Sequence, residues 1–135
     1  MLSGMVFLAC KKEKATAPGC AVTMENLAGA YKLTALQYKV SANATPTDYL
    51  AILDDCEKDN IINLKDDGTY KEEDTGIVCS PSETSEGSWQ LHGNTLISDG
   101  TLNGTISSFD CKTLVFYVEN ALKTGDRLTY TMERQ

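Results

Sequence analysis

Five cysteines are the side chains of this chain with the most reactive chemistry, and their spacing decides which chemistry they can do. They stand at positions 10, 20, 56, 79 and 111, and no two of them form a Cys-x-x-Cys pair. The last four lack the close spacing of zinc ligands, so a zinc site is not indicated. Well-separated cysteines in a small domain are typical of disulfides in an oxidising compartment. We therefore expect Cys20, Cys56, Cys79 and Cys111 to be paired, which leaves Cys10 for another role.

The other polar side chains do not form a catalytic or metal-binding pattern. His92 is the single histidine and stands beside Gly93, so we expect a surface turn residue rather than a base with a positioned partner. An acidic cluster lacks the spacing and the glycine of a calcium loop, and we expect a solvated loop there: Asp54, Asp55, Glu57 and Asp59. No serine lies in a Gly-x-Ser-x-Gly elbow. We predict no catalytic residue, no metal and no cofactor, and hence not an enzyme.

Length and charge set further bounds. The chain has 135 residues, enough for one domain with a single core. Its formal net charge is −7, which argues against nucleic acid as a partner, because phosphate binding needs a concentrated basic patch.

The first 22 residues have the composition of a targeting and anchoring segment. An apolar run over residues 2–9 is too short to span a bilayer and is typical of a truncated signal-peptide h-region, residues 1–9. Phe7-Leu8-Ala9-Cys10 resembles a bacterial lipobox, in which Cys10 would carry the lipid, although Phe7 and Leu8 depart from its usual residues. An ordinary signal peptide or a late start remains an alternative. Residues 10–22 are then a polar, lipid-anchored tether, followed by a domain over residues 23–135.

A hairpin with a cysteine at each open end is the centre of that domain. Asp67-Gly68 is a strong turn signal, and a three-residue loop places Leu64 opposite Tyr70. A two-residue loop would bring Cys56 opposite Cys79 directly, but Leu64 would then share a face with Lys71. The apolar pairing favours the longer loop, with a bulge at Gly76 joining Cys56 to Cys79. Cys20 and Cys111 would then remain as the other two thiols.

Alternation of apolar and polar residues predicts eight strands joined by short polar turns. They are expected at residues 30–40, 60–65, 69–75, 87–92, 95–98, 101–107, 112–119 and 126–134. Short helices are expected at 23–29 and 47–53, capped by Thr23 and Thr47. The inward phase flips at Leu36, which predicts a bulge in the first strand. Connections this short require antiparallel neighbours, so the fold class is all-β, an eight-stranded antiparallel up-and-down barrel with one or two short helices.

Several short motifs in this order resemble the lipocalin-like domains of bacterial lipoproteins. They are Leu27-Ala-Gly-Ala-Tyr31-Lys-Leu33, Asp66-Asp-Gly-Thr-Tyr70, Gly87-Ser-Trp-Gln-Leu91, Gly93-Asn-Thr-Leu96 and Tyr130-Thr-Met132. Tyr31 stands where the family's Gly-x-Trp motif has tryptophan. The resemblance covers residues 23–134 and implies an eight-stranded calyx, without any catalytic residues.

The predicted barrel, together with the lipobox-like segment, leads to the hypothesis of a non-catalytic envelope lipoprotein that binds or carries a small apolar ligand. The residues expected to face that ligand are Tyr31, Leu33, Leu64, Tyr70, Trp89, Phe116 and Tyr130. In a barrel this small, the aromatic side chains could instead fill the interior, which would favour an envelope interaction or scaffold module without a ligand. The expected setting is a monomer held by lipid on Cys10 at the outer membrane of a diderm bacterium, facing either the periplasm or the surface.

Overall fold

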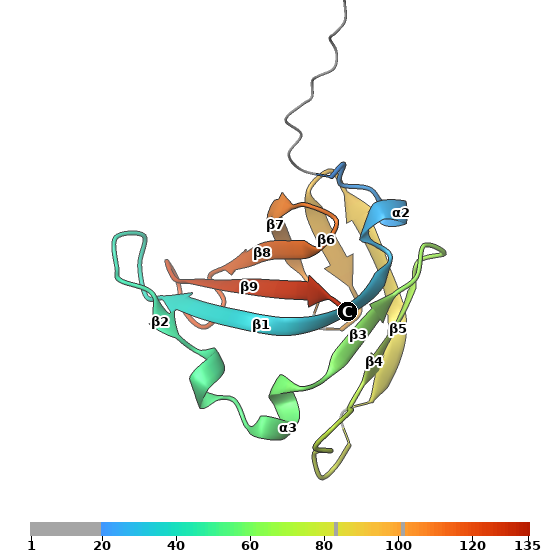
Figure 1. Ribbon diagram of the computed structural model, residues 1–135. Coiled ribbons are helices and arrows are strands. Elements are labelled where there is room, and N and C mark those ends of the chain that lie inside the picture. The colour runs from blue at the N-terminus through green and yellow to red at the C-terminus, as the bar shows by residue number, and fades with distance from the viewer. Residues whose placement is uncertain (1–19, 83, 101) are drawn as a thin grey trace, which may run out of the picture.

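The eight predicted strands form a closed antiparallel barrel (Figure 1). The computed structural model describes residues 20–82, 84–100 and 102–135. Its strands are β1 (Gly29–Lys39), β2 (Thr47–Asp48), β3 (Ile61–Leu64), β4 (Thr69–Glu73), β5 (Ser85–His92), β6 (Thr95–Ser98), β7 (Gly104–Phe109), β8 (Thr113–Glu119) and β9 (Arg127–Arg134). Its helices are α2 (Met24–Leu27), the 3-10 helix Leu50–Ile52 and α3 (Asp55–Lys58).

Closure comes from β1, which pairs with β3 along one edge and with β9 along the other. From β3 to β9 each strand pairs with the next, so the order around the barrel follows the chain. The two-residue strand β2 adds only an antiparallel extension to the end of β1. A closed barrel leaves no long strand edge open to another chain. The predicted fold class is therefore confirmed.

β1 bends where the inward phase was predicted to flip. Its register against β9 shifts between Leu33 and Ala35, and Tyr31 and Leu36 are both buried although they are an odd number of residues apart. The extra residue of the bulge allows one strand to cover two neighbours of the barrel, β3 at its start and β9 along its length.

The hairpin of β3 and β4 has the register that its apolar residues predicted. Leu64 lies opposite Tyr70, and the Lys65 N–H donates to the Thr69 carbonyl at 2.9 Å. The Asp67 carboxylate accepts hydrogen bonds from the Thr69 hydroxyl and N–H, which hold the pKa of Asp67 below its usual value. The three-residue loop is therefore confirmed.

The predicted disulfide between Cys56 and Cys79 is present. However, the two cysteines are not brought together by a bulge in the β3–β4 ladder, as was predicted. The ladder ends at Ile61 and Glu73, so Gly76 lies in a loop beyond it with φ +64°. Cys56 belongs to α3, and the Asp59 carboxylate accepts from the Ile77 N–H at 2.6 Å. The cysteines meet because a helical turn and a loop fold together, which strand pairing alone could not predict.

The opposite end of the barrel is closed by the segment before β1. Thr23 caps α2 by accepting from the Asn26 N–H, as predicted, and Leu27 is fully buried. Cys20 forms a disulfide with Cys111, and its N–H donates to the Phe109 carbonyl at 3.0 Å. The chain is therefore fastened to the barrel from Cys20 onward within the described residues.

Tyr31 fills the floor of the barrel at this end. Its hydroxyl donates to the Leu27 carbonyl at 2.8 Å and accepts from Arg134 Nη2 at 2.8 Å. The Arg134 guanidinium also lies 5.3 Å from the centre of the Tyr31 ring. Burial raises the pKa of Tyr31, and the nearby Arg134 opposes that rise. A tyrosine therefore packs and hydrogen-bonds fully where the related motif has tryptophan.

Three other local predictions were wrong. Residues 47–53 form β2 and a single 3-10 turn instead of one helix, because Thr47 and Asp48 pair with the backbone of β1. The acidic cluster expected as a solvated loop contains α3, whose Glu57 carboxylate accepts from the Asp54 N–H. The strand expected at 101–107 begins at Gly104, because Asn103 accepts from the Ser98 N–H and holds the preceding turn.

No helix of the described part of the chain is both long enough and apolar enough to cross a membrane.

Candidate ligand-binding site

A cavity of about 100 Å³ lies inside the barrel. Most of its wall is apolar, formed by Leu33, Ile62, Leu102, Phe116, Tyr130 and Met132. The remaining lining residues are polar: Glu57, Asn60 and Glu72. We call these three the polar edge of the cavity. The site thus combines one apolar wall with one group of oxygen-rich side chains.

Strand register explains why the apolar wall is continuous. Phe116 of β8 lies opposite Tyr130 of β9, and Met132 of β9 lies opposite Leu33 of β1. Residues two apart on a strand share a face, so Tyr130 and Met132 point into the barrel together. The rings of Phe116 and Tyr130 are stacked, with centroids 4.8 Å apart and planes only 2° from parallel.

Tyr130 brings a hydroxyl group to this wall. Burial raises the pKa of Tyr130, and no hydrogen bond contributes to the rise. The phenol therefore stays neutral at physiological pH and can both donate to and accept from a bound molecule.

The polar edge is positioned by β4, α3 and the residue before β3. Glu72 lies opposite Ile62 in the hairpin, so its side chain shares the inward face of Ile62. Glu57 belongs to α3, where one of its oxygens accepts from the Asp54 N–H at 2.8 Å. The Cys56–Cys79 disulfide fastens this helix to the loop after β4. The geometry of the polar edge therefore depends on a helix that a disulfide holds in place.

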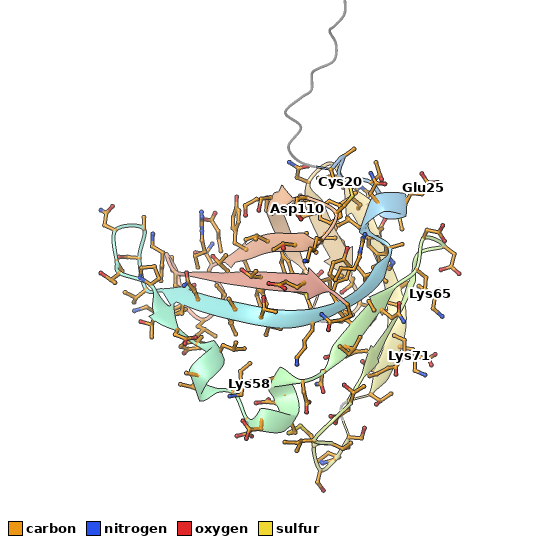
Figure 2. The ribbon with its side chains drawn as sticks, in the orientation of Figure 1. Cys20, Glu25, Lys58, Lys65, Lys71 and Asp110 are labelled. Carbon is orange, nitrogen blue, oxygen red and sulfur yellow. A yellow bond between two sulfur atoms is a disulfide. The ribbon has the colours of Figure 1, made fainter. Side chains whose placement is uncertain are left out.

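The two disulfides lie at opposite ends of the barrel. Figure 2 shows Cys20 and Asp110 at the end where the chain enters, and Lys58 of α3 at the other. Figure 2 also shows Lys71 on the outer side of β4, consistent with its alternation with the inward residues Tyr70 and Glu72. The polar edge belongs to the α3 end.

The structure places three of the seven predicted ligand-facing residues at the cavity: Leu33, Phe116 and Tyr130. The other four are packed in the core: Tyr31, Leu64, Tyr70 and Trp89. The Trp89 indole donates to the Lys65 carbonyl at 2.9 Å, and burial with the nearby Asp99 raises the pKa of Tyr70. These four side chains fill the interior and leave the cavity to one part of the barrel.

Six cavity residues were not predicted. Ile62, Glu72 and Met132 follow the inward alternation of their strands, so the pattern could have identified them. The Asp54-x-x-Glu57 capping box is a helix-start signal that could have located α3. Leu102 and Asn60 precede strands, and their inward position depends on tertiary packing.

A second hollow, at the turn between β8 and β9, contains the buried carboxylate of Asp126. The Asp126 carboxylate accepts hydrogen bonds from the Tyr38 hydroxyl and from the backbone N–H groups of Ala121, Leu122 and Lys123. Burial alone would raise the pKa of Asp126, but these hydrogen bonds outweigh burial and lower it. This carboxylate therefore holds the turn between β8 and β9 together.

The remaining polar candidates give no catalytic geometry. His92 is exposed and its Nε2 lies 2.8 Å from the Gln90 side-chain oxygen. Among the residues that the structure describes, no three His, Cys, Asp or Glu side chains are grouped to hold a metal ion. Cys10, the expected lipidation site, lies outside the described residues.

Comparison with known proteins agrees with the barrel. The family described as lipocalin-like domain matches residues 27–116, which is 90 of the 135 residues. Neither the curated proteins nor the solved structures contain a match to this chain. The chain belongs to the lipocalin-like domain family, as its motifs indicated. Proteins of this family generally bind ligands rather than catalyse reactions.

Proposed function

We propose that this protein is a non-catalytic binding protein of the cell envelope that holds one small, largely apolar molecule inside its barrel. The observation that carries the proposal is the cavity, whose lining combines six apolar side chains with a few convergent polar groups. Small-molecule sites in proteins have this composition, and the interior of a barrel is a frequent place for them.

The size of the cavity limits the ligand. An apolar cavity of about 150 Å³ accommodates benzene, whereas this cavity measures about 100 Å³. The ligand, or the part of it that enters the barrel, is therefore a short alkyl chain or a group of similar size. Long-chain lipids would need the packed side chains of Tyr70 and Trp89 to move, and both are more than nine-tenths buried.

Native mass spectrometry of gently purified protein tests this function. We expect a stoichiometric small molecule that is lost in Met132→Trp, because the larger side chain would occupy the cavity. Thr131→Trp is the matched control, since the neighbouring residue of β9 points away from Met132. A clean ligand-free mass from several preparations, together with no binding of added short-chain alcohols, would argue against the proposal.

The lipid anchor on Cys10 is the second part of this proposal. The apolar run before Cys10 and the polar residues after it support it, and two disulfides fit an oxidising envelope compartment. Cys10→Ala should move the protein from the membrane fraction to the soluble fraction and abolish incorporation of labelled fatty acid. A variant that keeps both properties would remove the anchor from the proposal.

A scaffold or docking role is the alternative, and one feature favours it. Three apolar side chains near α3 are well exposed: Ile52 at 65%, Ile77 at 60% and Val78 at 57%. Contiguous exposed apolar patches mark contact surfaces, and Ile77 and Val78 precede Cys79 in the loop that its disulfide fastens to α3. If the cavity binds nothing, the triple variant with serine at these positions should lose an envelope partner that cross-linking captures with the native chain.

A further inference from the structure

One hydroxyl group at the cavity has no hydrogen-bond partner in the described part of the chain. It belongs to Tyr130 of β9, which lines the cavity, and burial alone raises the pKa of its phenol. We propose that this hydroxyl donates a hydrogen bond to the ligand, and that the ligand is a small neutral molecule with a carbonyl oxygen on a short apolar body. This inference rests on the proposed function and names the ligand class of the same cavity.

The other tyrosines with a raised pKa differ from Tyr130 because each has an acceptor within the protein. They are Tyr31 with the Leu27 carbonyl, Tyr38 with the Asp126 carboxylate and Tyr70 with the Asp99 carboxylate. A hydroxyl in apolar surroundings without a hydrogen-bond partner costs free energy, and a partner recovers that cost. The fold gives three phenols an acceptor and leaves the donor of Tyr130 at the cavity, where a ligand oxygen can supply the acceptor.

The polar edge does not offer the same donor. Among the described residues that line the cavity, two side chains carry a hydrogen-bond donor, the Asn60 amide and the Tyr130 hydroxyl, whereas the carboxylates of Glu57 and Glu72 are acceptors. Asn60 already takes part in an interaction within the protein. Tyr130 therefore brings to the cavity a donor that the fold itself does not use, and such a donor is complementary to an acceptor group on the ligand.

The ring of Tyr130 is held in place by the neighbouring strand. It lies opposite Phe116 in the register of β8 and β9, and the two rings are stacked with centroids 4.8 Å apart. A side chain whose rotamer is fixed by packing loses little entropy when it binds a ligand. Leu33 and Met132 continue the wall beside these rings. A carbonyl group on an apolar body thus matches both the donor and its surroundings.

The charge and the size of the cavity limit the rest of the ligand. None of the described lining residues is Lys, Arg or His, so a carboxylate ligand would leave water without a cation to balance its charge. The cavity measures about 100 Å³, and a cavity of about 150 Å³ holds benzene, so a molecule of about four or five non-hydrogen atoms is of suitable size. 2-Butanone is a neutral ketone of this size.

Three probes of matching shape test the inference. They are 2-butanone, 2-methyl-1-butene, which has a CH₂ group in place of the carbonyl oxygen, and propanoate, which has a charged oxygen in place of a methyl group. Each is titrated into the full chain while amide chemical shifts are followed by NMR. We expect the two neutral probes to bind and propanoate to bind more weakly than 2-butanone. Tyr130→Phe keeps the stacked ring, so it should lower the ratio of 2-butanone affinity to 2-methyl-1-butene affinity by about fivefold.

The possible outcomes separate the ligand class from binding itself. An unchanged affinity ratio in Tyr130→Phe would overturn the carbonyl inference while leaving the binding function intact. Propanoate binding as tightly as 2-butanone would overturn the neutral class in the same way. Absence of binding by all three probes would overturn the binding function as well.

Tyr117→Phe is the matched control, because it also removes one phenol hydroxyl. Tyr117 follows Phe116 on β8 and points to the outer face, where the Arg127 guanidinium lies 4.0 Å from the centre of its ring. An equal fall of the affinity ratio in this variant would contradict the assignment. In the ligand-free protein, the urea midpoint of Tyr130→Phe should equal or exceed that of the native chain. A lower midpoint would show that the hydroxyl bonds to the protein and would overturn the inference.

Discussion

Removing the two disulfides separately should have different effects on stability and on ligand binding. The paired changes are Cys56→Ala with Cys79→Ala, and Cys20→Ala with Cys111→Ala. The bonded cysteines are 23 residues apart in the first disulfide and 91 apart in the second. In the chain-entropy description, a cross-link restricts the unfolded chain more as its loop lengthens. These loops correspond to losses of about 3.4 kcal/mol for the first pair and about 4.6 kcal/mol for the second.

Urea unfolding with linear extrapolation measures both losses. Proteins of this size have slopes of about 1–3 kcal/mol per molar urea, so each loss lowers the midpoint by roughly 1 M or more. Both variants exchange two partly buried cysteines for alanine, so each serves as the control for the side-chain change in the other. The free energy of unfolding should fall further when Cys20 and Cys111 are replaced.

The order for ligand binding should be the reverse. Cys56 precedes Glu57 in α3, so loss of its disulfide frees the helix that carries one side of the polar edge. The Cys20–Cys111 disulfide joins the entering chain to the opposite end of the barrel. We expect the affinity for a short-chain alcohol to fall several-fold only in the Cys56/Cys79 variant. The reasoning would be refuted if the shorter loop gave the larger stability loss, or if both variants bound the probe equally well.

Three further predictions concern the packing around the site. Tyr31→Phe removes a buried hydroxyl that donates to the Leu27 carbonyl and accepts from Arg134. It should lower the free energy of unfolding, measured in urea, by about 1–3 kcal/mol. A loss below about 0.5 kcal/mol would show that the barrel floor does not need these hydrogen bonds. Asp126 has a lowered pKa in the folded state, so its carboxylate stabilises the fold above its unfolded pKa and loses that effect as pH falls through the folded pKa. The stability difference between the native chain and Asp126→Asn should therefore shrink on acidification, and a difference that is constant from neutral to acid pH would contradict this. Gly100→Ala would place a Cβ in steric conflict with the Tyr70 hydroxyl oxygen, so it should lower the free energy of unfolding by about 1–3 kcal/mol. Tyr70→Phe should relieve part of that loss, and additive effects in the double-mutant cycle would exclude the clash as the cause.

The sequence predicted the barrel well because its signals are local. Alternation of apolar and polar residues with period two identifies a strand with one solvent-exposed face. The Asp67-Gly68 turn, together with the apolar pairing of Leu64 with Tyr70, fixes the register of the hairpin. The phase flip before Leu36 marked the bulge for the same reason. A one-residue error in any of these would have turned the apolar residues to solvent, so the pattern strongly constrains the register.

The candidate site was only partly predictable from the sequence. An inward-facing apolar residue can either pack in the core or line a cavity, and the alternation pattern is the same in both cases. Tyr31 and Trp89 had the same inward pattern as Phe116 and Tyr130, yet the first two are packed in the core and the last two border the cavity. That difference depends on how side chains from several strands fit together around one volume. Alternation in the sequence predicts which face of the sheet each side chain lies on, but not whether a cavity remains between the side chains inside the barrel.

By itself the sequence determined the closed antiparallel barrel and the hairpin register. It also predicted that Cys56 pairs with Cys79, but not the helical turn and loop that bring these two cysteines together. Only the tertiary structure decided that Cys20 meets Cys111, that α3 carries Glu57 to the cavity, and that Glu72 joins it there. The physical reason is range: alternation and turn chemistry act between near neighbours in the chain. The cavity and its two carboxylates arise where β1, β3, β4, β8, β9 and α3 converge, and that convergence exists only once the barrel has closed.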